Sequence, residues 1–188
     1  MTAPTLFGPD PNTALGYVVS RASVLPQWLE FGQLAYDPEA LVTALLAAGK
    51  QVEAIRCIAV AIPVRQAIWW GWVSSRHALQ LQPPKPALAP IFTQLLGLVE
   101  QWIEQPTDAR RASAWQAAQA IGIEHPVSLA AAAVWFSGNN IAPAGAAAEV
   151  PAPAGMAHNF VTAAVAVAAT HGDPAGIEER YRTSVAQG

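Results

Sequence analysis

The chain has 188 residues, 53% of them hydrophobic and only 12% charged, and its formal net charge at pH 7 is −3. The ten basic residues are scattered and form no stripe, which argues against nucleic acid as a partner. The length corresponds to one domain, and a charged fraction below the usual ~25% leaves alanine, proline and apolar side chains on part of the surface. Such a surface is a candidate for contact with a partner protein. Alanine is, however, also abundant in helical proteins from GC-rich genomes without any role in binding.

Helix-start signals and helical spacing predict an all-α chain. We expect residues 1–10 to be an extended lead-in and residues 11–188 to form a single helical domain. Asp10-Pro11 and Asp37-Pro38 are typical of an N-cap followed by a first-turn proline, and Gly49 is typical of a helix C-cap. The first half therefore predicts helices over 11–21, 38–48, 51–61 and 63–79, with a short helical piece over 27–35.

The second half begins after a Pro-rich break at 83–86. Thr107 is a predicted N-cap, and Asp108 with Arg110 and Arg111 indicates favourable helix-start charges plus an exposed basic pair. An Ala/Pro-rich stretch at 141–154 predicts the one long loop, extended in character. Helices are expected over 88–104, 108–121, 127–136, 156–170 and 175–185, and the piece over 127–136 is apolar enough all round to be buried.

The connections within 38–79 are almost without loops, which is typical of neighbouring antiparallel helices. No segment alternates convincingly with the period of two that a half-buried strand requires. The predicted fold class is all-α: a compact single-domain bundle of about eight or nine helices around a Trp-rich central helix.

That central helix is the stretch 63–79, which begins near Pro63 and holds three of the seven tryptophans. Its spacing places Arg65, Trp69, Trp72 and Arg76 on one narrow stripe. Trp70 and His77 share a second face. The third face is made of Ile68 and small residues that allow close packing by a neighbour: Ala67, Gly71, Ser74, Ser75 and Ala78. We expect such a helix to leave little surface for water.

The stripe has two interpretations. In the first interpretation, Arg65 and Arg76 lie above and below the two indoles and form a cation–π ladder that binds a carboxylate or a peptide. Alternatively, Trp69 and Trp72 belong to the core, and the arginine stems cross them to reach structural carboxylates.

Other candidate sites are sparse. Among the histidines, His77 is the best placed for acid–base or ligand chemistry, whereas His125 and His171 lie at expected helix ends, where capping roles are predicted. The turn that contains Asn139 and Asn140 can orient a polar ligand through its backbone, although Gly-Asn is first of all a turn. No metal-ligand spacing, nucleotide-binding loop or esterase elbow occurs, so we expect no metal, no cofactor and no catalytic residue.

The features that bear on compartment favour the cytoplasm. The lone Cys57 lies in an apolar run, so we expect a buried, unreactive thiol in a reducing compartment. The first residues lack the basic and apolar regions of a signal peptide, and no apolar stretch reaches the ~20 residues of a membrane span.

Several motifs resemble one known family. They are I-P-x-R-Q-A-I-W-W (62–70), S-R-H-A (75–78), W-I-x-x-P-T-D-x-R-R-A (102–112), A-A-x-A-I-G (117–122), A-A-A-V-W-F-S-G (131–138) and the Ala-rich stretch that ends in G-D-P (162–174). From about Asp37 to Arg182 the chain resembles a family of uncharacterised bacterial proteins, a domain of unknown function. The resemblance carries no catalytic residues, and it implies a genomic neighbourhood of type VI secretion genes.

These observations leave three functional hypotheses. The first is a non-enzymatic adaptor or chaperone that binds a secretion component or an effector. The second is a small-molecule-binding protein or enzyme that uses a pocket lined by Arg65, Arg76 and His77 and walled by Trp69 and Trp72. The third is a structural homodimer. The absence of a paired acid–base constellation favours binding over catalysis.

Overall fold

The structure, a computed structural model, describes residues 38–142 and 146–188. The lead-in and the two helical segments expected before residue 37 lie outside these residues. Within the described part the chain is helical and contains no β-strand, so the predicted all-α bundle is confirmed. Its elements are α2 (Pro38–Ala47), α3 (Gln51–Ala61), α4 (Val64–Leu81), α5 (Ala89–Glu104), α6 (Asp108–Ile121), α7 (Pro126–Phe136), α8 (Met156–Ala169), the 3-10 helix η2 (Pro174–Gly176) and α9 (Ile177–Gln187).

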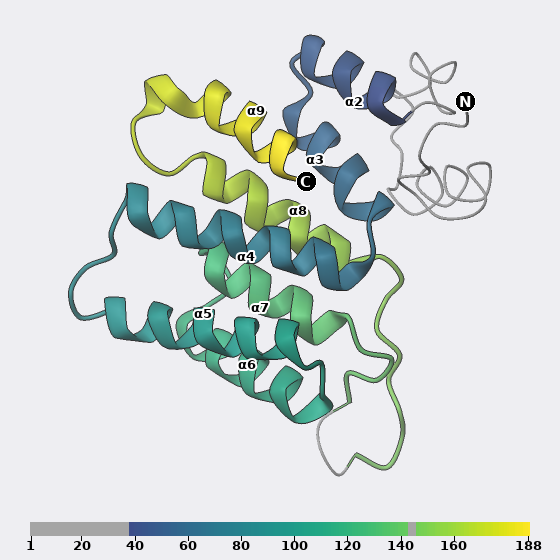
Figure 1. Cartoon of the computed structure of the whole chain (residues 1–188). Helices are drawn as coiled ribbons and strands as arrows, with labels where there is room; N and C mark the ends of the chain where they lie inside the picture. Colours follow the sequence, from purple (N-terminus) through teal and green to yellow (C-terminus); the bar gives the residue numbers. More distant parts are fainter. Residues whose placement is uncertain (1–37, 143–145) are drawn as a thin grey trace.

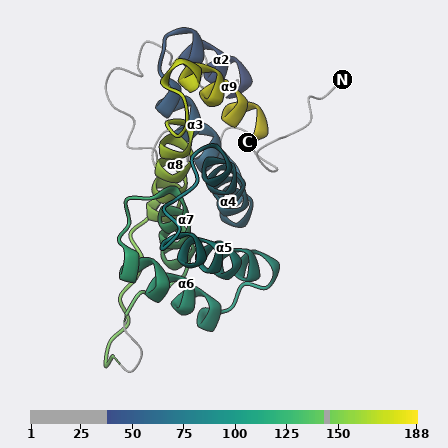
Figure 2. The same ribbon diagram turned by 90° about the vertical axis from the view of Figure 1, so that its left-hand side faces the viewer.

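Three helices, α4, α7 and α8, form the middle of the bundle (Figure 1). Helix α8 packs against α7, α4 and α3, while α7 also packs against α5 and α6. Figures 1 and 2 show α2, α3 and α9 at one end of this group and α5 and α6 at the other. The most enclosed helix is α7, whose residues from Pro126 to Val134 are all buried, as its apolar composition predicts.

The small face of α4 packs against a neighbouring helix, as predicted, and the structure shows that this helix is α8. Ala67, Gly71, Ser74, Ser75 and Ala78 are all buried. A Cβ atom built on Gly71 would lie 3.7 Å from Ala164 Cβ, so the two backbones approach as closely as small side chains permit. Ser75 Oγ donates to the Gly71 carbonyl at 2.7 Å, which satisfies a hydroxyl group that is cut off from water.

Two tryptophans of α4 connect it to opposite parts of the bundle. Trp70 is 1% exposed, and its Nε1 donates to the Ser184 carbonyl of α9 at 3.0 Å. Trp72 Nε1 donates to the Leu96 carbonyl of α5, also at 3.0 Å. Each buried indole therefore contributes apolar area and has its single donor satisfied.

The helix ends largely follow their sequence signals. Thr107 accepts from Arg110 N at 3.3 Å and is the N-cap of α6. Gly49 and Gly122 have φ of +71° and +82°, values that favour glycine after a helix. Pro63 is one position earlier than expected: it is the extended N-cap residue of α4, not part of its first turn.

Candidate functional site

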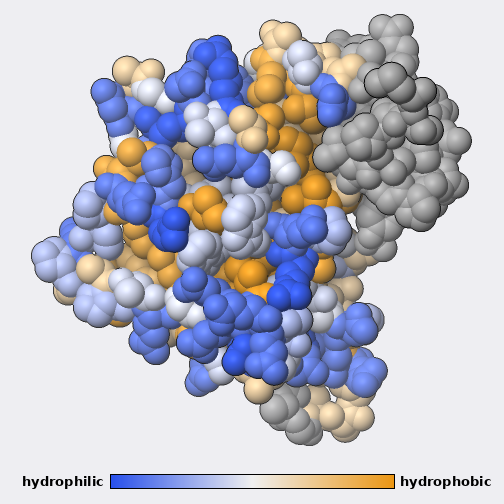
Figure 3. Space-filling view, viewed as in Figure 1, coloured by the Kyte–Doolittle hydropathy of each residue, from blue (hydrophilic) through white to orange (hydrophobic). Residues whose placement is uncertain are grey.

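One side of α4 is open to solvent, and we call it the α4 strip. It spans about 100° of the helical wheel and comprises Gln66, Trp69, Val73, Arg76, His77 and Gln80. All are exposed except the half-buried Val73. The expectation that this helix leaves little surface for water was therefore wrong. Figure 3, viewed as Figure 1, shows mostly hydrophilic side chains over α5 and α6 and a hydrophobic surface over α2 and α3.

The α4 strip contains Trp69, which is 48% exposed. Its neighbour Trp70 is 1% exposed and Trp72 is 8% exposed, so of the two stripe tryptophans only Trp72 belongs to the core. Helical spacing places Trp69 and Trp72 on one stripe, but they lie 60° apart on the helical wheel. The edge of the solvent-exposed face of α4 lies between them. The interpretation that buried both indoles was wrong for Trp69.

Arg65 caps a neighbouring helix. Its Nε donates to the Ile103 carbonyl at 2.6 Å and its Nη2 to the Glu104 carbonyl at 2.9 Å. These carbonyls belong to the last turn of α5, where they lack partners within the helix and where a cation is favoured by the helix dipole. Arg65 thus reaches backbone carbonyls, not the carboxylates expected from the sequence.

Arg76 forms the one cation–π contact found on the predicted stripe. Its Cζ lies 4.9 Å from the centroid of the Trp72 ring. The guanidinium is exposed, so this contact covers the indole without using all five of its donors. Arg76 is therefore available to a carboxylate that approaches the α4 strip.

A pocket of about 60 Å³ opens between α4, the end of α8 and α9. Of the seven predicted site residues, His77 lines it. The pocket is bordered on α4 by Ser74 and His77, whereas Arg65, Trp69, Trp72 and Arg76 are not part of its wall. The geometry therefore separates the predicted Trp/Arg stripe from this cavity.

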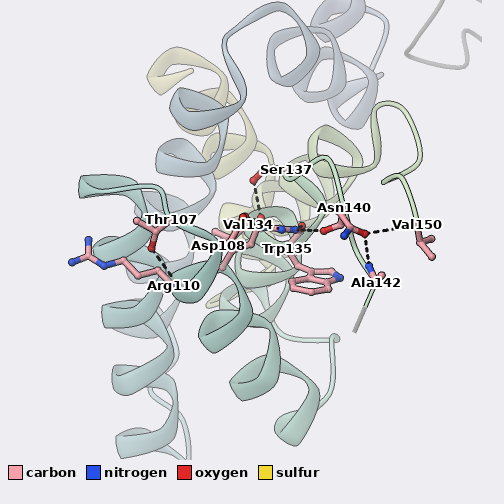
Figure 4. A network of polar contacts seen from close by, with 10 residues as sticks. Thr107, Asp108, Arg110, Val134, Trp135, Ser137, Asn140, Ala142 and Val150 are labelled. Carbon is pink, nitrogen blue, oxygen red and sulfur yellow. Dashed lines mark hydrogen bonds and ion pairs between the residues drawn. The ribbon is translucent and has the colours of Figure 1, made fainter. Parts of the chain in front are cut away.

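The most buried charge in the described residues is Arg111, which is 7% exposed. Figure 4 shows Asp108, Trp135 and Asn140, whose oxygen atoms accept its hydrogen bonds. Its Nε and Nη2 donate to Asp108 Oδ1 at 3.1 and 2.9 Å, and its Nη1 donates to the carbonyls of Trp135 and Asn140 at 3.0 and 2.9 Å. Its Cζ also lies 4.8 Å from the centroid of the Trp135 ring. The expectation of an exposed basic pair was wrong for Arg111, because two of its acceptors are backbone carbonyls of α7 and the following turn, 24 and 29 residues away.

The turn after α7 is built around this guanidinium. Asn140 Oδ1 accepts from Ala142 N and Val150 N, both at 2.9 Å, and so closes the base of the loop predicted at 141–154. A Cβ atom on Gly138 would lie 2.2 Å from Arg111 Cζ, so glycine is required for the close approach. Asn139 is exposed. Asn140 therefore uses its side chain within the fold, and neither asparagine is shown to face a cavity.

Two histidines and a phenylalanine meet near the beginnings of α5 and α7 and the end of α8. The His125 ring stacks on Phe92 with centroids 4.1 Å apart, and its edge contact with His171 is 5.4 Å. His125 Nδ1 accepts from Val127 N at 3.3 Å and caps α7, which confirms the predicted capping role. Burial, followed by the nearby His171, lowers the pKa of His125 from 6.5 to about 4. The ring is neutral in the folded protein near neutral pH.

This lowered pKa predicts a loss of stability in mild acid. The unfolded chain binds a proton at His125 near pH 6.5, whereas the folded chain does so only near pH 4. The contribution of His125 to the free energy of unfolding is thus fully present above pH 6.5 and is lost as the pH falls towards 4. The loss is ~1–2 kcal/mol after a discount for solvent screening of the half-buried ring. Urea unfolding across this range measures the decrease. The His125→Asn variant, which keeps a capping side chain but cannot titrate, should show a flatter pH profile, and an unchanged profile would contradict the assignment.

Among the described residues, the remaining candidates are the Cys57 thiol and clusters of possible metal ligands. Cys57 is 6% exposed, and burial raises the pKa of its thiol to about 12, so the expectation of a buried, unreactive thiol is confirmed. Residues 38–142 and 146–188 contain no group of three or more His, Cys, Asp or Glu side chains that could hold a metal ion. Nor does any helix in those ranges have the length and apolar character needed to cross a membrane.

The fold and the site together define a helical-bundle protein with a solvent-exposed strip on its central helix, the α4 strip, and a small pocket beside it. The chain belongs to a family of unknown function (DUF6931), whose sequence profile matches residues 41–188 and so spans nearly all of the described helices. This membership agrees with the expectation of a domain of unknown function. Comparisons with curated proteins and with solved structures give no match.

Proposed function

We propose that the chain is a non-enzymatic adaptor or chaperone that binds a protein partner through the α4 strip. The observation that carries this proposal is the half-exposed indole of Trp69, which lies on a helix whose other tryptophans are buried. Tryptophan combines a large apolar area with few rotatable bonds, and for this reason it is enriched among residues that dominate binding energy at protein interfaces.

Exposed large hydrophobic side chains on α4, on α5 and in the turn between them add apolar area to this part of the chain, in addition to the hydrophobic surface that Figure 3 shows over α2 and α3. Among the described residues, seven large hydrophobic side chains are exposed, and four of them belong to α4, α5 or the turn between these helices: Trp69, Leu81, Leu88 and Ile91. Exposed aliphatic residues that occur singly need no explanation, but their concentration on one pair of helices favours a contact surface there.

The charges of α4 indicate the chemistry of the partner. The helix carries Arg65, Arg76 and His77 and contains no carboxylate, although the whole chain has a net charge of −3. Since Arg65 is engaged by α5, Arg76 is the arginine left to receive an external carboxylate. The expected partner segment therefore places an apolar side chain on Trp69 and an acidic one near Arg76.

The type VI secretion context comes from the sequence resemblance, and it supplies the identity that we propose for the partner. A secretion component or an effector in the cytoplasm is the expected ligand. Sedimentation at two concentrations separates such a hetero-complex from a structural homodimer, because only self-association depends on the concentration of this chain alone.

The test is a pull-down from native lysate with the tagged protein, read by mass spectrometry. Wild type should recover one secretion component or effector in near-equal amount. Trp69→Ala should reduce the recovery at least ~10-fold, as expected for loss of an interface anchor, whereas it should barely change stability. The matched control is Ile123→Ala, since Ile123 is 41% exposed but lies outside α4.

The same experiment can overturn the proposal. Equal recovery by Trp69→Ala and wild type would exclude the α4 strip as the contact surface. Recovery of the protein alone would exclude a stable partner and leave the small-molecule alternative.

A further inference from the structure

The polar side chains of the α4 strip are not used within the fold. Elsewhere on α4, Arg65 and Trp72 donate to carbonyls of α5, and Trp70 donates to a carbonyl of α9. On the strip, five exposed side chains form no hydrogen bond or ion pair with the described part of the chain: Gln66, Trp69, Arg76, His77 and Gln80. Their donors are therefore free to bind a partner.

The α4 strip is also the side of α4 that no neighbouring helix covers. Within the described ranges, α4 packs against α8, α7, α5 and α3. The strip runs from Gln66 to Gln80, which makes it about 21 Å long at ~1.5 Å per residue. Its width of about 100° is that of the stripe which a surface helix commonly buries. The strip thus has the dimensions of a contact face for one helix of about 15 residues.

The backbone chemistry of α4 favours a helical segment over an extended one. The backbone groups in the middle of a helix bond to each other, so α4 offers an incoming chain only its side chains. An extended segment that covered Trp69 and Val73 would bury its own N–H and C=O groups without enough partners, and each such group is costly. A helical segment satisfies its backbone internally and presents side chains alone.

The charges of the strip define the direction of such a helix. Arg76 and His77 lie in the C-terminal half of α4, whereas Trp69 lies in its N-terminal half. Carboxylates are favoured in the first turn of a helix by the helix dipole. A helix antiparallel to α4 places its first turn beside Arg76, so the ion pair and the dipole act together, whereas in a parallel helix they would oppose each other.

The same charges argue against a second copy of this chain on the strip. Helix α4 contains no aspartate or glutamate. Two α4 strips packed against each other would therefore bring no carboxylate to Arg76 of either copy, and the partner must come from a different sequence.

We propose that the α4 strip binds an antiparallel amphipathic helix of a partner protein, with acidic side chains in its first turn and a large aliphatic side chain two turns later. The acidic turn meets Arg76 and His77, and the aliphatic side chain packs on Trp69. Trp69 and Arg76 are seven residues apart, about 10 Å along α4, and a spacing of seven residues on the partner helix reproduces this distance. This inference rests on the proposed adaptor function and names the form and direction of the segment that the adaptor binds.

The test is a titration of the isotope-labelled protein with synthetic helices, followed by amide NMR shifts. The probe is a capped peptide of about 15 residues, with two glutamates in its first turn, leucines seven and eleven positions later, and alanine and glutamine elsewhere. Saturable shifts at Trp69, Val73 and Arg76 are expected, with a Kd of about 0.1–1 mM because a short free helix is only partly ordered.

Two control probes test the direction and the helical form separately. The first has the reversed sequence, which moves the glutamates to the last turn, and it should bind at least ~3-fold more weakly because the dipole then opposes them. The second carries a central proline that breaks the helix, and it should bind at least ~10-fold more weakly. No saturable shift with the first-turn probe, or equal affinity for all three probes, would overturn the proposal.

Variants of the protein locate the contact. Trp69→Ala should weaken binding of the probe at least ~10-fold, and Arg76→Ala should weaken it ~3–10-fold and remove most of its dependence on salt. The matched control is Arg182→Ala, since Arg182 is 63% exposed and pairs with glutamates of its own helix. Equal weakening by Arg76→Ala and Arg182→Ala, or shifts of the strip that grow with protein concentration alone, would contradict the proposed ligand.

Failure of this inference can be distinguished from failure of the adaptor function, because the probe titration needs no lysate. Loss of partner recovery in Trp69→Ala, together with equal affinities for the three probes, would leave the adaptor function standing and exclude the antiparallel acidic helix as its ligand.

Discussion

Replacing Trp70 with alanine is expected to lower the free energy of unfolding by ~3–5 kcal/mol. The side chain is 1% exposed, lies in the main hydrophobic core and donates to the Ser184 carbonyl. The substitution removes the apolar contacts, leaves a cavity between α4 and α9, and deprives a carbonyl of its donor. Urea unfolding measures the loss as a lower midpoint at an unchanged m value.

Two variants make this prediction specific. Trp69→Ala changes the adjacent tryptophan, which is 48% exposed, and should cost less than ~1 kcal/mol. Trp70→Phe retains most of the buried area but loses the donor to Ser184, so an intermediate loss of ~1–2 kcal/mol is expected. Equal destabilisation by Trp69→Ala and Trp70→Ala would contradict the orientation of α4 in which Trp70 is buried and Trp69 is exposed.

Replacing Arg111 with alanine is expected to cost ~2–4 kcal/mol. The guanidinium makes four hydrogen bonds, and two of their acceptors are the carbonyls of Trp135 and Asn140, which would lose a donor. Gly138→Ala should be similarly costly, because its Cβ atom would lie 2.2 Å from an Arg111 Cζ that those bonds hold in place. Both losses are read from urea midpoints.

The pair forms a double-mutant cycle with a clear expectation. In the Arg111→Ala background the methyl group of Gly138→Ala meets no guanidinium, so the second substitution should cost far less than it does alone. Arg110→Ala is the matched control: its Nη1 bonds to the Gln101 carbonyl from the surface, and ~1 kcal/mol is expected. Additive losses for Arg111→Ala and Gly138→Ala would show that the two residues do not share this contact.

The sequence by itself determined the features that depend on neighbouring residues. The all-α class, the helix over 63–79 to within two residues, the Thr107 cap and the turns at Gly49 and Gly122 all depend on proline, capping groups and glycine within a few positions. The close packing of the small face of α4 was also predictable, since only small side chains permit such an approach.

The tertiary structure decided everything that depends on which face meets a neighbour. Helical spacing placed Trp69 and Trp72 on one stripe but carried no information on where the solvent boundary falls. Arg111 had the appearance of a surface residue because the carbonyls that bind it lie more than 20 residues further along the chain. The pocket is formed by α4, α8 and α9, which are far apart in the sequence. Such sites arise from packing between distant segments, and no local pattern of residues specifies that packing.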